Sequence, residues 1–180
     1  TDLKVLLIRR AVAPFADHWA LPGGFVKVTD GGEQGESLSD AASRELEEET
    51  GLPANKVYLE QLYTFGDPGR DPRGRTITVA YYALVRPDLV QLLDAGTDAA
   101  EARWFSMAEE VGQLDLGFDH ATILQTALER IRGKIDYSPL ALRLVPPTFT
   151  IAQLRQVYEA IKGLTYDPGN FRRRFKRMQT

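Results

Sequence analysis

The sequence predicts an α+β fold followed by a small helical domain, and three features of its 180 residues support this prediction. Segments rich in β-branched and aromatic residues are interspersed with segments whose apolar residues recur at helical spacing. Hydrophobic residues make up 43% and charged residues 26% of the chain, which is typical of a globular protein and excludes a disordered or collagen-like one. The charge is unevenly placed. Residues 151–180 hold seven basic and two acidic residues, which gives them a net charge of +5. Because the net charge of the whole chain is −3, residues 1–150 carry a net charge of −8.

Composition excludes several classes of protein. The chain has no cysteine, which excludes disulfide scaffolds and thiolate metal sites. Its longest apolar runs, such as residues 5–8 and 79–85, fall well short of the ~18–20 residues that a membrane-spanning helix needs. No secretory leader opens the sequence. We therefore expect a cytoplasmic protein of a reducing compartment that does not bind a membrane.

The first two thirds of the chain predict strands and one capped helix. A bend at residues 22–24 separates two extended pieces. Ser37 and Asp40 form a capping box for a helix that Gly51 terminates. The apolar stripe of this helix is expected to consist of Leu38, Ala42 and Leu46. The expected strands cover residues 3–10, 57–64, 76–85 and 103–105.

A second helix and a linker are predicted to follow the strands. Residues 121–132 place their apolar side chains on one side of a helix. Residues 137–147 contain three prolines, which indicates a linker, although their Leu and Val content predicts that this linker packs against the body. We therefore divide the chain into a first domain over residues 1–116, a connecting helix and linker over residues 117–147, and a C-terminal domain over residues 148–180.

Glu45, Glu48 and Glu49 lie at positions i, i+3 and i+4 of the predicted helix, which aligns them on one face. Carboxylate oxygens in this arrangement favour Mg²⁺ or Mn²⁺, ions that keep waters and bind substrate phosphates. The pattern predicts phosphoanhydride hydrolysis, in which metal neutralises phosphate charge while a carboxylate deprotonates an attacking water. The alternative is a solvated acidic helix face. His18 and His120 have no ligand spacing, and we expect both to be structural.

The stretch from Glu36 to Leu52 resembles the second half of the Nudix box, G-x5-E-x7-R-E-U-x-E-E-x-G-U, where U is aliphatic. Residues 19–24, Trp-Ala-Leu-Pro-Gly-Gly, resemble the bend that precedes this box in the family. Eleven residues, 25–35, separate Gly24 from Glu36 where the family has five, and Asp30 stands at a glycine position, so we expect a loop insertion. The resemblance implies an α/β/α sandwich with a mixed sheet.

The resemblance also implies which residues bind a metal. Glu48 and Glu49 would bind it, Gly24 would add its carbonyl oxygen, and Glu45 would bind the metal or act as the base. The implied cofactor is Mg²⁺ or Mn²⁺.

Supporting and additional residues are implied in the same way. Arg44 and Glu36 would complete the catalytic arrangement as structural supports. Family members often recruit one more carboxylate from a later loop, and Asp98 or Glu101 would supply it unless both are plain surface acids.

Residues 66–75 form a turn-rich loop between two predicted strands, and with residues 76–82 they resemble the ADP-ribose pyrophosphatase branch of the family. Arg70 and Arg75 would reach the phosphates of the nucleotide. The alternative is a solvated hairpin loop. The aromatic residues predicted to stack on adenine are Trp19, Tyr63 and Phe65.

The basic C-terminal domain has the proportions of a helix-turn-helix. Thr150 and Gln153 form a capping box for its first helix, Gly163 ends that helix, and Pro168 begins the second. The basic side of the second helix is suited to DNA phosphates and guanine edges, unless this is a solvated terminal helix docked by its phenylalanines. The candidate DNA-binding residues are Asn170, Arg172, Arg173, Arg174, Lys176 and Arg177.

Residues 118–120, 149–159 and 170–173 resemble the winged helix of Nudix-related transcriptional regulators of NAD metabolism. With the Nudix-like part, this resemblance covers nearly the entire chain. It implies a homodimer that binds double-stranded DNA and senses ADP-ribose or a related nucleotide. We expect the β-hairpin wing to be missing, since the sequence stops at Thr180.

Three hypotheses follow from these features. The first is a metal-dependent Nudix hydrolase of ADP-ribose-like compounds fused to a winged helix, and the retained box residues favour it. The second is an ADP-ribose-sensing transcriptional regulator with little or no hydrolysis. The third, a structural adaptor with neither activity, is disfavoured by the intact acidic helix face.

Overall fold

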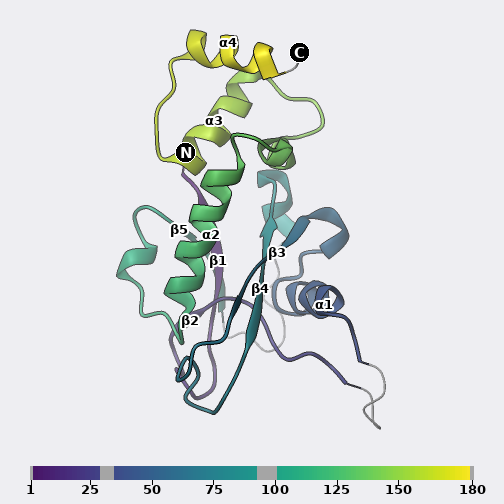
Figure 1. Cartoon of the computed structure of the whole chain (residues 1–180), viewed down its shortest axis with the longest axis vertical. Coiled ribbons are helices and arrows are strands. Elements are labelled where there is room, and N and C mark those ends of the chain that lie inside the picture. The colour runs from purple at the N-terminus through teal and green to yellow at the C-terminus, as the bar shows by residue number, and fades with distance from the viewer. Residues whose placement is uncertain (1, 29–34, 93–100, 179–180) are drawn as a thin grey trace.

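The structure is a computed structural model that describes residues 2–28, 35–92 and 101–178. Within these ranges, five strands and four α-helices, with four short 3-10 helices, follow one another (Figure 1). Their bounds are β1 Lys4–Arg9, β2 Trp19–Ala20, α1 Leu38–Thr50, η1 Ala54–Lys56, β3 Tyr58–Phe65, β4 Thr78–Leu84, η2 Pro87–Leu92, β5 Glu101–Ser106, η3 Val111–Gln113, α2 His120–Lys134, η4 Pro139–Arg143, α3 Ile151–Lys162 and α4 Pro168–Met178.

The strands form two sheets whose neighbours are antiparallel. One sheet has the order β2-β1-β5, and its central strand pairs along its whole length with β5, from Lys4 opposite Ser106 to Arg9 opposite Glu101. The other sheet is the β3–β4 hairpin, which has an irregularity between Gln61 and Tyr63. The parallel pairing expected of a mixed sheet is limited, in the described residues, to an isolated bridge between Trp19 and Leu116.

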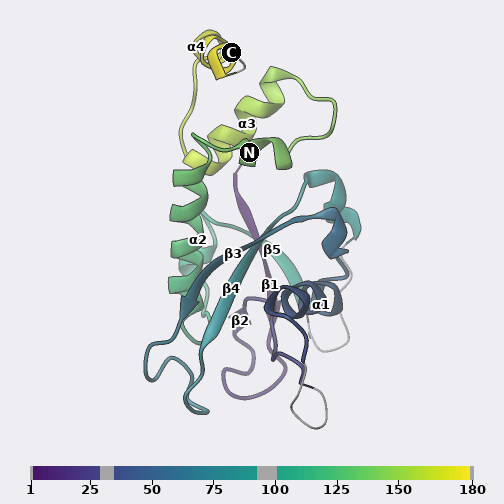
Figure 2. The same cartoon turned by 45° about the vertical axis from the view of Figure 1, so that its right-hand side comes forward.

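Two helices cover the strands from opposite sides, as the sandwich expectation requires. Figure 2 shows α2 on one side of the strands and α1 on the other. On the α2 side, Ile123 and Ile131 join Leu62, Phe65 and other strand residues in the main apolar cluster. The strands thus hold α1, with its glutamates, on the face opposite α2.

The C-terminal helices pack on the far end of α2 (Figure 1). Leu154 and Ile161 of α3 and Phe171 of α4 belong to the same apolar cluster as the β3–β4 hairpin. The Tyr158 hydroxyl donates a hydrogen bond of 3.1 Å to the Ile135 carbonyl at the end of α2. The predicted linker packs as expected, since Leu140, Ala141 and Val145 are buried. The C-terminal helices are therefore joined to the body by a shared core.

The two predicted N-caps are present, Thr150 within a complete capping box, and one predicted apolar stripe is wrong. Ser37 and Thr150 are N-caps that accept from the backbone N–H three residues later, and Gly51 and Gly163 end their helices in the left-handed conformation. Leu38, however, is 46% exposed, and the buried residues of α1 are Ala41 and Thr50. Ala42 and Leu46 of the predicted stripe are only partly buried. No helix within the described ranges is long and apolar enough to cross a membrane.

Candidate functional site

Helix α1 carries the predicted site residues on its C-terminal half. Local hydrogen bonds hold both ends of this helix. The Ser37 hydroxyl accepts from the Asp40 N–H at 3.1 Å. The Gly51 N–H donates to the Glu47 carbonyl at 2.9 Å, with a φ of 68° that favours glycine. Thr50 is fully buried, and its hydroxyl donates to the Leu46 carbonyl and accepts from the Leu52 N–H. The helix therefore presents its glutamates on a fixed face.

Arg44 is the centre of an ion-pair network on this face. Its Nε and Nη2 atoms donate to the Glu36 carboxylate at 2.9 and 2.5 Å. Its Nη1 atom donates both to Glu45, at 2.6 Å, and to Glu48, at 2.8 Å. Nη2 also reaches the Phe25 carbonyl at 3.1 Å. One guanidinium thus orients three carboxylates and the chain segment that precedes the helix.

These contacts shift the pKa values of the groups involved. Hydrogen bonds from Arg44, and then from the Lys27 backbone N–H, lower the pKa of Glu36 to about 2. Arg44 and the Lys27 ammonium, 3.2 Å away, lower the pKa of Glu48. The carboxylates, Glu36 first, raise the pKa of Arg44. Glu36, Arg44 and Glu48 are therefore charged at neutral pH.

The Gly23–Gly24 bend packs directly on the acidic face of α1. The Gly23 N–H donates to Glu49 Oε2 at 2.6 Å. A Cβ atom at Gly24 would lie 2.3 Å from Glu45 Oε1, closer than any real contact. A side chain at this position would therefore require the Glu45 carboxylate to move. The structure thus brings together all six residues predicted for catalysis or metal binding: Gly24, Glu36, Arg44, Glu45, Glu48 and Glu49.

The arrangement of these carboxylates does not fit a bound metal ion. Within the described ranges, no group of three His, Asp or Glu side chains is placed to hold one. The donor chemistry suits a hard cation, but one oxygen of Glu45 and one oxygen of Glu48 already accept from the same Arg44 Nη1 atom. Of the two extra carboxylates considered, Asp98 lies outside the described residues, and Glu101 is an exposed residue at the start of β5.

Of the aromatic residues predicted to stack on adenine, Trp19 and Phe65 are packed in apolar clusters and do not present free rings at the acidic face of α1. Trp19 packs edge-on against Phe105, with ring centroids 4.6 Å apart, in a second apolar cluster. Phe65 is 9% exposed and belongs to the main core, while Tyr63 beside it is 58% exposed. Base stacking by these residues stays a prediction, and Trp19 and Phe65 have packing roles.

The two predicted phosphate-binding arginines are also engaged elsewhere. Arg70 donates two hydrogen bonds to Asp119, at 2.8 and 2.6 Å, and a third to Thr78 at 2.7 Å. Its side chain is 6% exposed. Arg75 is exposed and donates to the Gly66 carbonyl within its own loop. These contacts give Arg70 a structural role that spacing alone does not reveal.

The two histidines, which were predicted to be structural, each lie within hydrogen-bonding distance of a backbone atom. The Leu21 N–H donates to His120 Nδ1 at 3.0 Å, and burial lowers the pKa of His120 to about 4, so the ring is neutral and accepts this bond. His18 lies 3.0 Å from the Ala16 carbonyl through its Nδ1. The contact between Leu21 and His120 joins the bend before the box to the first turn of α2.

The predicted DNA-binding residues lie on the exposed side of α4. Phe171 is buried and Phe175 partly buried, and these rings anchor the opposite side of the helix. Arg174 also donates to Asp136 at 2.9 Å, which ties it to the end of α2. All six candidates are exposed: Asn170, Arg172, Arg173, Arg174, Lys176 and Arg177.

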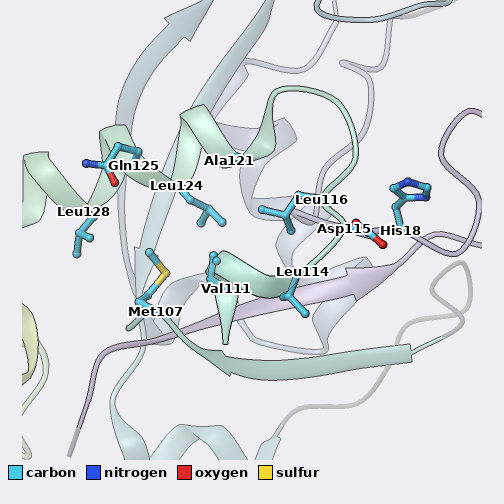
Figure 3. A pocket seen from close by; sticks show the side chains of 11 residues that line it. His18, Met107, Val111, Leu114, Asp115, Leu116, Ala121, Leu124, Gln125 and Leu128 are labelled. Carbon is cyan, nitrogen blue, oxygen red and sulfur yellow. The ribbon is translucent and has the colours of Figure 1, made fainter. Parts of the chain in front are cut away.

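An open pocket of about 510 Å³ lies apart from the box, between α2 and the segment that follows β5 (Figure 3). None of the residues around it belongs to the acidic face of α1. Its apolar lining residues are Met107, Val111, Leu114, Leu116, Leu124 and Leu128.

The fold, the box helix and the basic helix pair define a Nudix protein with an appended pair of C-terminal helices, and comparison with known proteins agrees. The chain belongs to the Nudix family, because residues 1–127 match the NUDIX domain. Residues 141–180 match the NrtR DNA-binding winged helix domain. The resemblance predicted from the box and from the C-terminal helices is confirmed.

Two curated relatives are similar to the chain. One is the "ADPR responsive transcriptional repressor NtrR" of Acinetobacter baylyi, 40% identical over 96% of this chain and 66% of the relative. The other is the "ADP-ribose pyrophosphatase" of Methanocaldococcus jannaschii, 40% identical over 69% of this chain and 65% of the relative. The chain thus spans just under two thirds of the length of these relatives.

Two solved structures are similar along nearly the whole chain, and a third is similar to its Nudix part. A MutT/nudix family protein from Enterococcus faecalis has a TM-score of 0.80 and 35% identity, covering 97% of this chain and 73% of that one. NrtR of Shewanella oneidensis complexed with a 27mer DNA has a TM-score of 0.78 and 34% identity, and the match covers 99% of this chain and 77% of that one. The NUDIX domain of that NrtR complexed with ADP-ribose has a TM-score of 0.60 and 38% identity, and the match covers 72% of this chain and 79% of that one.

Proposed function

We propose that the protein is a DNA-binding transcriptional regulator whose Nudix domain binds ADP-ribose. The observation that carries this proposal is the similarity, over 99% of the chain, to an NrtR that was crystallised on DNA. The same two-part arrangement is present here, because α3 and α4 share one apolar core with the Nudix domain. The regulator hypothesis therefore takes precedence over the hydrolase hypothesis that the box alone favoured.

The DNA-binding half of the proposal rests on α4. Its Arg172, Arg173 and Lys176 side chains are exposed, while Phe171 holds the helix against α3. Exposed arginines on an anchored helix can bind phosphates and reach guanine edges in the major groove. A homodimer would place two such helices on the half-sites of a palindrome.

The sensing half rests on the Nudix domain, which we assign to residues 1–116, with residues 117–147 connecting it to a DNA-binding domain over residues 148–180. The ADP-ribose complex of the NrtR NUDIX domain, which covers 72% of this chain, supports the choice of ligand. The linker packs through Leu140 and Val145, so a change in the Nudix domain reaches α3 through a continuous core. A regulator of this kind acts in the cytoplasm, where the DNA is.

Fluorescence anisotropy of a labelled 27-base-pair duplex, selected by the protein from a randomised pool, tests the DNA activity. We expect the double variant Arg172→Ala with Arg173→Ala to bind weakly and to lower the slope of log K against log salt by about 2. Arg130→Ala removes an exposed arginine of α2 and is the matched control. Unchanged binding by the double variant would rule out α4 as the DNA-binding helix.

The same duplex tests the sensing activity. Addition of ADP-ribose should change the apparent DNA affinity by roughly fivefold or more, because the two ligands are coupled through one protein. AMP and ribose 5-phosphate, added separately, are the controls for selectivity. An affinity that is the same with and without ADP-ribose, at concentrations that saturate the Nudix domain, contradicts the regulator proposal.

Hydrolysis of ADP-ribose is the second candidate function, and the intact acidic face of α1 favours it. Glu45, Glu48 and Glu49 are all present, and the relative named ADP-ribose pyrophosphatase is 40% identical. Mg²⁺ or Mn²⁺ would have to replace Arg44 and Lys27 as partners of Glu48. Release of AMP from ADP-ribose with either metal, compared with a Glu48→Gln variant, decides between turnover and binding alone.

A further inference from the structure

Asp136 lies in the turn that follows α2 and pairs with one basic residue from each of the two C-terminal helices. Its Oδ1 atom accepts from Arg174 Nη2 of α4 at 2.9 Å, and its Oδ2 atom accepts from Lys162 Nζ of α3 at 2.5 Å. The hydrogen bond from Lys162 is the main cause that lowers the pKa of Asp136, so this carboxylate is charged at neutral pH. One carboxylate therefore contacts both helices of the C-terminal pair.

Lys162 is the more firmly held of these two partners. Its Nζ atom also donates to the Arg132 carbonyl at 2.7 Å, and its side chain is 19% exposed. The Arg174 side chain is 45% exposed, and an exposed ion pair contributes little to stability because water screens it. If Arg174 left, Asp136 would keep Lys162 as its counter-charge. Arg174 can therefore exchange this partner for another anion at a small cost.

The contact of Arg174 with a carboxylate comes from a distant segment and not from its own helix. Helix α4, Pro168–Met178, contains five basic residues and no acidic one. The acid that precedes it, Asp167, accepts from the Asn170 N–H at 2.8 Å and so caps the start of the helix. Asp136 lies 38 residues before Arg174 along the chain. Loss of the Asp136 carboxylate would thus leave the cap of α4 in place.

Arg174 lies at the edge of the basic side of α4. The Phe171 and Phe175 rings, on the apolar side, anchor the helix. Asn170 and Arg177, four residues before and three residues after Arg174, share its stripe of the helix and are exposed DNA-binding candidates. The Arg174 side chain thus begins among the residues proposed to face DNA, and its guanidinium is drawn to the end of α2.

We propose that Asp136 withholds Arg174 from the phosphates of a bound duplex, and so keeps the DNA affinity of the protein below the affinity that α4 alone would give. This inference rests on the proposed function, since it concerns the DNA-binding helix. Carboxylates and phosphates both accept hydrogen bonds from a guanidinium, so Asp136 and DNA compete for the same donors. Asp136 is a positioning residue, because it acts through Arg174 and not by touching DNA.

Anisotropy with the labelled 27-base-pair duplex tests the proposal in a double-mutant cycle. Asp136→Asn should bind the duplex roughly threefold more tightly or more, and should raise the slope of log K against log salt by about 1, because Arg174 gains a phosphate. The same substitution in an Arg174→Ala background should change neither quantity. A gain that persists without Arg174 would reflect only the loss of a negative charge and would overturn the proposal. Equal affinities of Asp136→Asn and the wild type would overturn it as well.

Asp88→Asn is the matched control. It removes the carboxylate of another exposed ion pair, Arg86–Asp88 at 3.0 Å in η2, and should leave the affinity and the slope unchanged. Should Asp136→Asn not fold, Arg174→Ala alone decides the matter. An unchanged slope in that variant supports the proposal. A slope lower by about 1 contradicts it, because Arg174 would then bind a phosphate in spite of Asp136.

Elution from immobilised heparin separates this proposal from the proposed function. Heparin is a polyanion without base sequence, so Arg174 can bind its anionic groups whether or not the protein recognises DNA. Asp136→Asn should elute at higher salt than the wild type, whereas the two proteins that carry Arg174→Ala should elute together. If this pattern is found but no duplex is bound, the competition by Asp136 stands and the DNA-binding proposal fails. If Asp136→Asn elutes with the wild type, Asp136 does not withhold Arg174, and the inference fails whether or not the duplex is bound.

Discussion

Arg70 and Asp119 form a two-point ion pair, with N···O distances of 2.8 and 2.6 Å, that ties the β3–β4 loop to the start of α2. At the other end of the same helix, Arg132 donates to the Ile161 carbonyl of α3 at 2.9 Å. Helix α2 therefore connects the surroundings of the Nudix box to the helix-turn-helix. We propose that changes in the Nudix domain reach α3 and α4 through this helix.

Asp119→Asn should destabilise the protein by about 3 kcal/mol, because it leaves the 6% exposed Arg70 side chain without its counter-charge. Urea unfolding measures the loss. Asp88→Asn removes one partner of the exposed Arg86–Asp88 pair and should cost less than about 1 kcal/mol. Similar losses in the two variants would mean that Arg70 is solvated in solution.

Gly24→Ala should disturb the box more than the fold. The added Cβ atom would lie 2.3 Å from Glu45 Oε1 and would push this carboxylate away from Arg44. Because the end of a flexible side chain yields, we expect a stability loss below about 1 kcal/mol but a decrease in ADP-ribose affinity of roughly tenfold. Differential scanning fluorimetry and calorimetry measure the two effects. Gly112→Ala, where a Cβ atom meets nothing within 4 Å, is the control.

The contribution of Glu36 to stability should disappear in acid. Its pKa is lowered from 4.5 to about 2 in the folded state, so its contribution is fully present above pH 4.5 and is lost as the pH falls through about 2. The difference in unfolding midpoint between the wild type and Glu36→Gln should therefore be constant near neutral pH and shrink between pH 4.5 and 2. Urea melts at a series of pH values measure it. Glu129 has no ion pair with a described residue. The difference in unfolding midpoint between the wild type and Glu129→Gln should therefore not shrink in the same way between pH 4.5 and 2.

Arg172→Ala should weaken DNA binding more than Arg174→Ala. Arg172 is exposed on α4, whereas Arg174 already donates to Asp136 at 2.9 Å and would have to leave that partner to reach a phosphate. Anisotropy across a range of salt concentrations should give a slope lower by about 1 for Arg172→Ala and a smaller change for Arg174→Ala. The reverse order would place Arg174 on the DNA and Arg172 in solvent.

Much of the fold could be predicted from the sequence because its signals are local. The N-caps Ser37 and Thr150 and the helix ends at Gly51 and Gly163 follow from side-chain and backbone contacts within a few residues. The predicted strands at residues 3–10, 57–64 and 76–85 agree with β1, β3 and β4 to within two residues at each end. The loop insertion is not tested, since residues 29–34 lie outside the described chain.

Helical periodicity alone was enough to place Glu45, Glu48 and Glu49 on one face, because spacing along a helix fixes side-chain direction. Tertiary contacts alone decided how the charges of the site are paired. Arg70 meets Asp119, 49 residues further along the chain, only after the β3–β4 loop and the start of α2 come together. Electrostatic partnership depends on distance in space, and a linear sequence records only distance along the chain.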